Sequence, residues 1–210
     1  MIIVTADQID STHTDDLAGT AVAHLNQRYT TRLVLPVDRN AGDEIQAIMT
    51  DPAAALALIL ELTRTGRWSV GCGIGRVRTP LPANTREAAG PGFVAAREAV
   101  GQAKRAPHRF ALCVDDAQPL GAGDIAPLLE LVLLVRSRRS QEGWELFDLI
   151  DQGMTQTDAA QKLSISPQAV SQRAQAAGIR SELAAHPPIA RLLGEADGDG
   201  GSDGGSDGER

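Results

Sequence analysis

"TRLVLPVDRNAGDEIQAIM", residues 31–49, contains two apolar runs rich in β-branched residues, separated by a polar turn. The turn "DRNAGDE" carries Gly42 and Asp43, and a glycine-containing loop between two such runs is typical of a β-hairpin. The flanking segments "TRLVLPV" and "IQAIM" supply its strands. This hairpin predicts that the N-terminal half of the chain is built around a β-sheet.

Strand and helix patterns alternate on both sides of the hairpin. The opening "MIIVTA" predicts a strand, and residues 15–29 predict a helix with Thr14 as its N-cap. The segment "DPAAALALILELTRTG" begins with Asp51 and Pro52 and closes with a glycine, which are helix start and stop signals. The later elements are a strand at 68–77, a helix at 93–105, a strand at 108–114 and a helix at 124–139. The glycines of the strand at 68–77 would allow another segment to approach its backbone closely. The order β-α-β-β-α-β-α-β predicts an α+β fold with a ferredoxin-like, or palm, domain.

The chain beyond Ser140 shows helical patterns and no strand signals. The predicted helices cover residues 141–153, 155–163 and 166–178. The second and third are joined by the short segment "SIS", a spacing typical of a DNA-binding helix-turn-helix. Small or apolar residues such as Ala160 and Val170 would let these two helices pack closely. The sequence therefore predicts an all-α helix-turn-helix domain at this end.

Polar side chains of this segment are suited to contact double-stranded DNA. Glutamine and arginine make paired hydrogen bonds to adenine and guanine edges in the major groove. The residues expected at the DNA interface are Thr155, Ser166, Gln168, Ser171, Gln172, Arg173 and Gln175. A basic turn with Arg136, Arg138 and Arg139 would add attraction for phosphate if it lies on the same face. The alternative is a helical hairpin that packs on protein instead.

Composition limits the class of protein. Hydrophobic residues make up 42% and aromatic residues 3%, which suits a globular chain but not single-strand nucleic-acid binding by base stacking. The formal net charge is −7, and most of it comes from the Gly/Asp/Ser-rich stretch 195–210. We find no signal-peptide pattern and no apolar run of membrane-spanning length. With Cys72 and Cys113 expected as buried thiols, these features predict a cytoplasmic protein without a membrane partner.

Four segments follow from these patterns. They are a palm domain at 1–122, a linking helix at 123–139, a helix-turn-helix domain at 140–194 and a disordered acidic tail at 195–210. The tail composition cannot bury an apolar core, which is why we predict disorder there. The chain is thus expected to combine one mid-sized and one small domain.

Two carboxylates follow strand ends that a palm fold brings together. Asp7 comes after the first strand, and Asp43 lies at the hairpin tip. Carboxylate oxygens are ligands that Mg²⁺ prefers, and a pair of such ions supports phosphoryl transfer. The alternative is that both residues only form turns.

These motifs resemble those of nucleotide cyclases. "DQIDST" followed by "RNAGDE" is similar to the two metal-aspartate motifs of class III nucleotide cyclases. "RNAGDEI" is also similar to the diguanylate cyclase signature, with Ala41 in place of a glycine and Ile45 in place of a phenylalanine. "GCGIGRV" and "AAGPGFVAAREAV" resemble the later cyclase strand and helix. The resemblance implies Mg²⁺ ligands at Asp7 and Asp43 and nucleotide-binding residues at Arg39, Gly42 and Arg97.

The whole chain is most similar to the SatD family, over about residues 1–180. The resemblance implies a cyclase-like domain, a linking helix and a helix-turn-helix, in that order. Phe93 stands where active cyclases have the asparagine that orients the ribose. Asp10 replaces a glycine and adds negative charge where a triphosphate would lie, which disfavours an anionic ligand. These two departures indicate that cyclisation activity is lost.

The combined prediction is a DNA-binding regulatory protein whose inactive cyclase-like domain serves in sensing or in dimerisation. Its expected partners are double-stranded DNA, a nucleotide ligand and a second copy of the chain. One alternative is an active nucleotide cyclase with two-metal catalysis at Asp7 and Asp43. A second alternative is a protein-interaction module that does not bind DNA.

Overall fold

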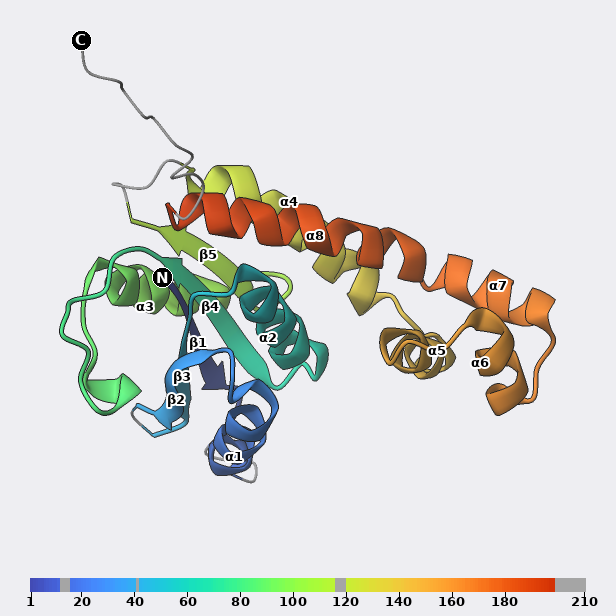
Figure 1. Ribbon diagram of the computed structural model, residues 1–210, viewed down its shortest axis with the longest axis horizontal. Helices are drawn as coiled ribbons and strands as arrows, with labels where there is room; N and C mark the ends of the chain where they lie inside the picture. The colour runs from blue at the N-terminus through green and yellow to red at the C-terminus, as the bar shows by residue number, and fades with distance from the viewer. Residues whose placement is uncertain (12–15, 41, 116–119, 199–210) are drawn as a thin grey trace, which may run out of the picture.

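The protein has an α+β fold, as predicted. The computed structural model describes residues 1–11, 16–40, 42–115 and 120–198. Thr14, Ala41 and the segment 199–210 therefore lie outside the described residues. Within the described ranges there are one five-stranded mixed sheet and eight α-helices (Figure 1). None of these helices has the length and apolar character needed to cross a membrane.

The sheet has the strand order β2-β3-β1-β4-β5. Its strands are β1 Ile2–Gln8, β2 Leu33–Arg39, β3 Glu44–Met49, β4 Trp68–Ile74 and β5 Phe110–Val114. The pairs β2–β3, β3–β1 and β1–β4 are antiparallel, whereas β5 joins β4 in parallel. The hairpin β2–β3 and the predicted alternation of strands and helices are confirmed.

Helices cover both faces of the sheet. On one face lie α1 Leu17–Tyr29, α2 Pro52–Arg64 and the sheet-proximal parts of α4 Ala122–Ser137 and α8 Ile179–Ala196. The other face packs against α3 Pro91–Ala103. Side chains of β1 alternate between the two faces, so that Val4 joins the main core and Ile3 meets α3.

The glycines of β4 allow α3 to approach the sheet closely, as their number in the sequence predicts. A Cβ atom added to Gly71 would lie 2.2 Å from the backbone nitrogen of Val100. A Cβ atom added to Gly73 would lie 2.2 Å from the backbone nitrogen of Ala96. The backbone of the helix therefore occupies the space that side chains of this strand would fill.

The helix boundaries agree with several predicted signals. Asp51 is the N-cap of α2, and Gly66 follows its end with a positive φ of 65°. For α1 the N-cap is Asp16, whose carboxylate accepts a hydrogen bond from the backbone N–H of Ala18 at 3.1 Å. Thr14, which we predicted in this role, lies outside the described residues.

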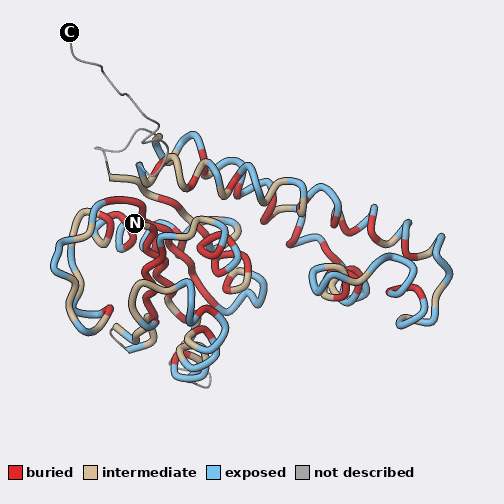
Figure 2. Tube along the Cα trace, in the orientation of Figure 1, coloured by how far each residue is buried: buried red, intermediate tan, exposed pale blue. Residues whose placement is uncertain are grey.

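The C-terminal half forms a second, smaller core. Helices α5 Gln141–Asp151, α6 Gln156–Leu163 and α7 Pro167–Ala176 pack around Leu146, Ala160 and Val170. Figure 1 shows this α5–α7 unit at the far end of the molecule from the sheet. In Figure 2 the buried positions concentrate in the sheet and its inner helices, whereas α6 and α7 are largely exposed.

Helix α8 is the main element that the sequence did not predict. It contains Pro187 and Pro188, which lack the N–H groups that an uninterrupted helix uses. The helix runs back along α4 to the sheet domain, where Ile189 and Leu193 enter the main core (Figure 1). The segment expected as a separate domain at 140–194 thus contributes its last turns to the sheet domain. The helix also continues to Ala196, into the segment predicted to be a disordered tail.

Candidate functional site

The surface of α6 and α7 is the candidate site at the far end of the molecule. Thr155 and Ser166 are the N-caps of these helices, and their hydroxyl oxygens accept hydrogen bonds from the backbone N–H groups of Asp158 and Ala169 at 3.2 and 3.1 Å. Ser164 ends α6 in the left-handed conformation with a φ of 54°. The two helices are therefore joined by a short turn with well-defined ends.

Helix α7 presents a continuous polar side to solvent. Gln168, Ser171, Gln172 and Gln175 are all exposed, and their spacing of three and four residues places them on one side of the helix. The opposite side is buried through Val170. These four residues are among those predicted to contact DNA, and their exposure leaves them accessible to a partner.

Arg173 differs from its predicted neighbours. It is half-buried, and its charge faces α5 closely enough to help lower the pKa of Glu142, after the larger effect of a hydrogen bond with Ser140. The guanidinium thus lies at the border of the polar side, between α7 and α5. Arg173 therefore lies at the edge of the exposed polar side of α7, not at its centre.

Two arginines of the basic turn at the C-terminal end of α4 are not available for the predicted phosphate contacts. The exposed fractions of Arg136 and Arg139 are 6% and 7%, and both guanidinium groups pair with Glu182 of α8. Arg138 remains exposed. The prediction was wrong for Arg136 and Arg139, because α8 covers them with a carboxylate that sequence spacing did not reveal.

The predicted Mg²⁺ ligands lie near one another at one end of the sheet. The backbone N–H of Gln8, next to Asp7, donates to the carbonyl of Asp43 at 3.2 Å. The Asp7 carboxylate, however, accepts a hydrogen bond from Nζ of Lys104, the C-cap residue of α3, at 2.8 Å. Within the described ranges, no three His, Cys, Asp or Glu side chains gather as a metal ion requires. In this arrangement Asp7 is paired with Lys104, and the prediction of Mg²⁺ ligands at Asp7 and Asp43 stays a prediction.

Asp7, a predicted metal ligand, and Arg39, a predicted nucleotide-binding residue, lie on opposite faces of the sheet. Asp7 is paired with Glu44 across the β1–β3 ladder, and Arg39 is paired with Ile45 across β2–β3. Because directly opposite residues share a face, Asp7 points to the α3 side and Arg39 to the α1 side. Arg39 accordingly pairs with Asp16 at 2.7 Å and donates to the carbonyl of Gly42.

Arg97 is placed apart from both groups. It is exposed on α3, two turns from Lys104 along the same helix side. It forms no ion pair with a described residue. The structure thus brings Arg39 together with Gly42, and Asp7 close to Asp43, but leaves Arg97 outside both pairs.

Comparison with protein-family models, curated proteins and solved structures finds no match.

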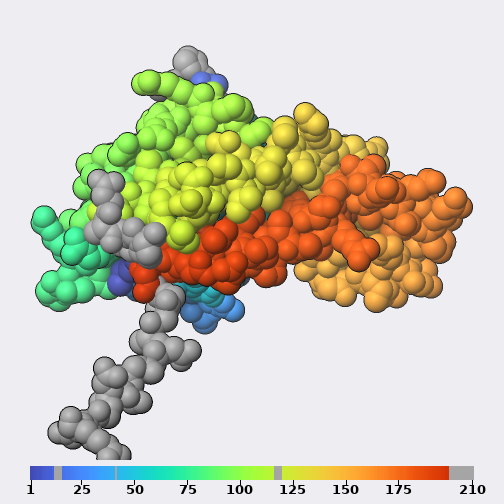
Figure 3. All heavy atoms as spheres, turned by 90° about the horizontal axis from the view of Figure 1, so that it is seen from above, coloured from blue at the N-terminus to red at the C-terminus, as the bar shows by residue number. Residues whose placement is uncertain are grey.

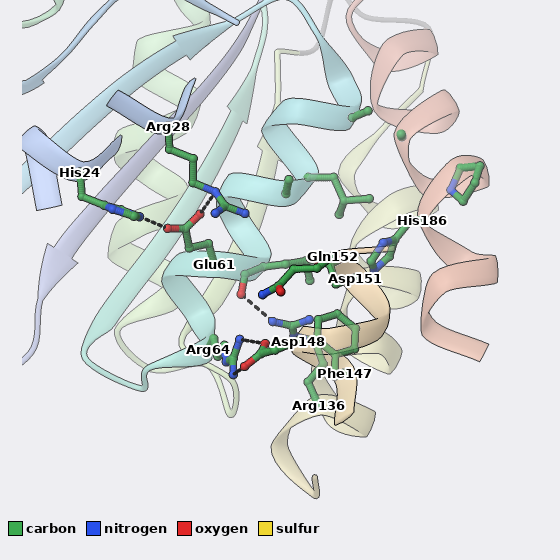
Figure 4. Close-up of a pocket in the computed structure, with 16 residues that line it drawn as sticks. His24, Arg28, Glu61, Arg64, Arg136, Phe147, Asp148, Asp151, Gln152 and His186 are labelled. Carbon is green, nitrogen blue, oxygen red and sulfur yellow. Dashed lines mark hydrogen bonds and ion pairs between the residues drawn. The ribbon is translucent and has the colours of Figure 1, made fainter. Parts of the chain in front are cut away.

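A cleft of about 620 Å³ separates the sheet domain from the α5–α7 unit. Its charged lining residues are His24 and Arg28 of α1, Glu61 and Arg64 of α2, Arg136 of α4, Asp148 and Asp151 of α5, and His186 of α8. Figure 4 shows both α1 side chains directed at Glu61, with distances of 2.6 Å from His24 and 3.0 Å from Arg28. Three arginines face three carboxylates, so the cleft has little excess charge to select a charged ligand.

Arginine side chains connect the sheet domain to the α5–α7 unit beside this cleft. Arg64 of α2 makes two hydrogen bonds, of 2.6 and 2.9 Å, to the carboxylate of Asp148 on α5. Arg64, Arg136 and Arg139 also surround the ring of Trp144, at 4.2 to 4.7 Å from its centroid. This joint holds the α5–α7 unit against the sheet domain. The joint was not predicted from the sequence, because its residues lie far apart along the chain.

Glu182 is the buried carboxylate of the joint. Burial alone would raise its pKa, but the nearby His186 and the charges of Arg136 and Arg139 outweigh burial and lower the pKa to about 2. The His186 ring nitrogen Nε2 lies 3.5 Å from the carboxylate without hydrogen-bond geometry. Glu182 is therefore expected to stay ionised over the whole neutral and mildly acidic range.

Acid should weaken the joint in a defined pH window. Because the folded pKa of about 2 is below the ordinary value of 4.5, the stability that Glu182 contributes is fully present above pH 4.5 and is lost as the pH falls toward 2. Urea titrations between pH 6 and 2 would measure this loss. The difference in unfolding free energy between the natural protein and Glu182→Gln should shrink across that window. A difference that stays constant down to pH 2 would contradict the assignment.

Proposed function

We propose that this protein is a DNA-binding regulatory protein, in which α6 and α7 form a helix-turn-helix and the sheet domain is a non-catalytic sensing or dimerisation module. The observation that carries the proposal is the exposed side of α7 with Gln168, Ser171, Gln172 and Gln175. These side chains can hydrogen-bond to base edges, and they lie on a helix that leaves its partner through a three-residue turn. DNA binding also implies the cytoplasm as the site of action.

The sheet domain supports the non-catalytic role. The order β2-β3-β1-β4, with α1 and α2 on one face, supports the ferredoxin-like palm that we propose for this domain. Opposite faces of the sheet carry Asp7 and Arg39, and Lys104 neutralises Asp7. This separation favours a cyclase-derived scaffold over an active cyclase. We retain a SatD-like organisation as part of the proposal.

The charge of the C-terminal segment determines how strongly salt should affect its affinity for DNA. Residues 140–194 contain six acids and four Lys or Arg residues, so few phosphates can be neutralised. Affinity should therefore fall only gently with salt concentration, and base contacts should contribute a large share of it. A single copy would bind weakly, which makes a dimer the expected DNA-binding form.

Replacing Gln172 by Ala should weaken binding to the preferred DNA sequence. A paired contact to one base is worth about 1–3 kcal/mol, which corresponds to roughly a 5- to 150-fold rise in Kd. The preferred sequence would be selected from random duplexes with the full chain, and Kd measured by fluorescence anisotropy. Gln27→Ala is a matched control, because Gln27 is also an exposed helical glutamine but belongs to α1 in the sheet domain.

Three outcomes bear on this proposal. Loss of affinity in Gln172→Ala but not in Gln27→Ala supports it. Equal effects of the two substitutions, or no binding to any duplex at low salt, would overturn DNA recognition by α7. Cyclic nucleotide product from ATP or GTP with Mg²⁺ would overturn the non-catalytic role of the sheet domain. Calorimetric titration with the same nucleotides tests the predicted ligand.

A further inference from the structure

Helix α4 carries an uncovered apolar stripe. Within the described ranges four large hydrophobic residues are exposed, and three of them, Leu128, Leu131 and Val135, belong to α4. Their exposed fractions are 40%, 60% and 38%. Spacings of three and four residues place them on one side of the helix, with Pro127 and Leu134 along its border.

The opposite side of α4 packs into the main core. Ile125, Leu129, Val132 and Leu133 are buried in the main core. The helix is therefore apolar on both sides, and a helix that is apolar all round is normally buried all round. Figure 3 shows α4, in lime to yellow, on the surface beside α8, with its outer side uncovered in this view. Among the described residues, the stripe is thus a surface without a packing partner.

Charges at the two ends of the stripe indicate what covers it. Asp124 and Arg138 lie on the same helix side as Leu131, each seven residues away from it in opposite directions. An antiparallel pair of α4 helices with a two-fold axis at Leu131 puts each Asp124 opposite the Arg138 of the other copy. The same axis places Leu128 opposite Leu134. A parallel pair would instead bring like charges together.

We propose that α4 is the dimerisation surface of this protein, which pairs with α4 of a second copy in antiparallel orientation about a two-fold axis at Leu131. Such an interface is self-complementary, as two-fold symmetric dimers require. Its area is that of one helix pair, below the roughly 1,200–2,000 Å² of a standard interface, so a Kd on the order of micromolar is expected.

The dimer would set the distance between the two α7 helices. Each α5–α7 unit follows the C-terminal end of α4, so antiparallel pairing places the two units at opposite ends of the pair. The 16 residues of α4 span about 24 Å at about 1.5 Å per residue. Each unit lies beyond the C-terminal end of its own α4, so the two α7 helices would be farther apart than this length and would contact separate half-sites of one DNA. This consequence alone rests on the proposed function, whereas the dimer itself does not.

Sedimentation equilibrium of the full chain, without DNA, tests the dimer. The natural protein should dimerise, and Leu131→Asp should raise the dimer Kd at least about tenfold, because it places two carboxylates together at the apolar axis. Val94→Asp is the matched control, since Val94 is 68% exposed on α3. A protein that stays monomeric to about 1 mM, or a dimer that Leu131→Asp leaves intact, overturns the proposal.

A charge exchange tests the antiparallel register. Arg138→Glu and Asp124→Arg should each weaken self-association, because each creates two repulsive pairs. A mixture of the two variants should form a heterodimer in which both pairs are again attractive. No recovery on mixing overturns the antiparallel register. Asp124→Arg also removes the hydrogen bond that the Gly121 N–H donates to Asp124. This loss is the same when the variant is measured alone and in the mixture, so it does not affect the comparison between the two.

A cysteine at the axis gives an independent readout. In a Cys113→Ser background, Leu131→Cys should cross-link to itself under mild oxidation at least about tenfold faster than Val94→Cys, because only a residue on the two-fold axis meets its own copy. Equal cross-linking rates would overturn the position of the axis. Because these measurements use no DNA, failure of DNA binding and failure of dimerisation are distinguishable.

Discussion

Replacing Glu182 by Gln should destabilise the folded protein by about 3–5 kcal/mol, the cost of removing one partner from a buried ion pair. The carboxylate is 2% exposed and pairs with Arg136 and Arg139 at once. Glutamine retains the volume but leaves two buried guanidinium charges without a neutralising partner. The backbone carbonyls of Leu60 and Ala177, which also accept hydrogen bonds from these arginines, do not compensate for a missing charge.

The same helix offers a matched control for this experiment. Glu195 pairs with Arg191 one turn earlier in α8, but both side chains are exposed. Glu195→Gln should therefore cost no more than about 0.5 kcal/mol. Urea unfolding can be followed through Trp144, which lies among the arginines of the joint, and through Trp68 in the main core. Equal costs of the two substitutions would show that the joint contributes no more than a surface ion pair.

Gly71→Ala should destabilise the protein by about 3 kcal/mol or more, at the upper end of the cost of overpacking a core. The new Cβ atom would lie 2.2 Å from the nitrogen and 2.7 Å from the Cα atom of Val100. These are backbone atoms of a helix, so no side-chain rotation relieves the contact. The whole of α3 must move away from β4, and the packing of Ala96 and Ala99 on the sheet would be lost with it.

Gly101→Ala is the control for this substitution. Gly101 belongs to the same helix, and a Cβ atom added there meets nothing within 4 Å. The substitution should raise stability by about 0.5–1 kcal/mol, because alanine favours the helix more than glycine does. Thermal or urea unfolding of the two variants should thus shift in opposite directions. Similar shifts would mean that α3 does not pack on β4 as closely as described.

Arg39 and Asp43 are close in the sequence, but the structure does not place Arg39 on the same face of the sheet as Asp7. Arg39 and Asp43 flank the tip of the same hairpin, and the sequence places both near Asp7. The ladder contains register shifts in β2 before it pairs Arg39 with Ile45, which sends the arginine to the α1 side. Since a change of register by one residue exchanges the faces, sequence spacing alone did not predict this outcome.

The sequence by itself determined the strand order along the chain, the hairpin at Gly42, the start of α2 at Asp51 and the exposed side of α7. Local signals suffice for these features, because turns, caps and helical spacing act over a few residues. Only the tertiary structure decided that Arg136 and Arg139 are buried and that α4 keeps an uncovered stripe. The burial of the two arginines depends on α8, a helix that contains two prolines and was not predicted from the sequence. Its Glu182 pairs with arginines that lie more than 40 positions earlier in the chain. Contacts of that range arise from packing, for which no local pattern exists.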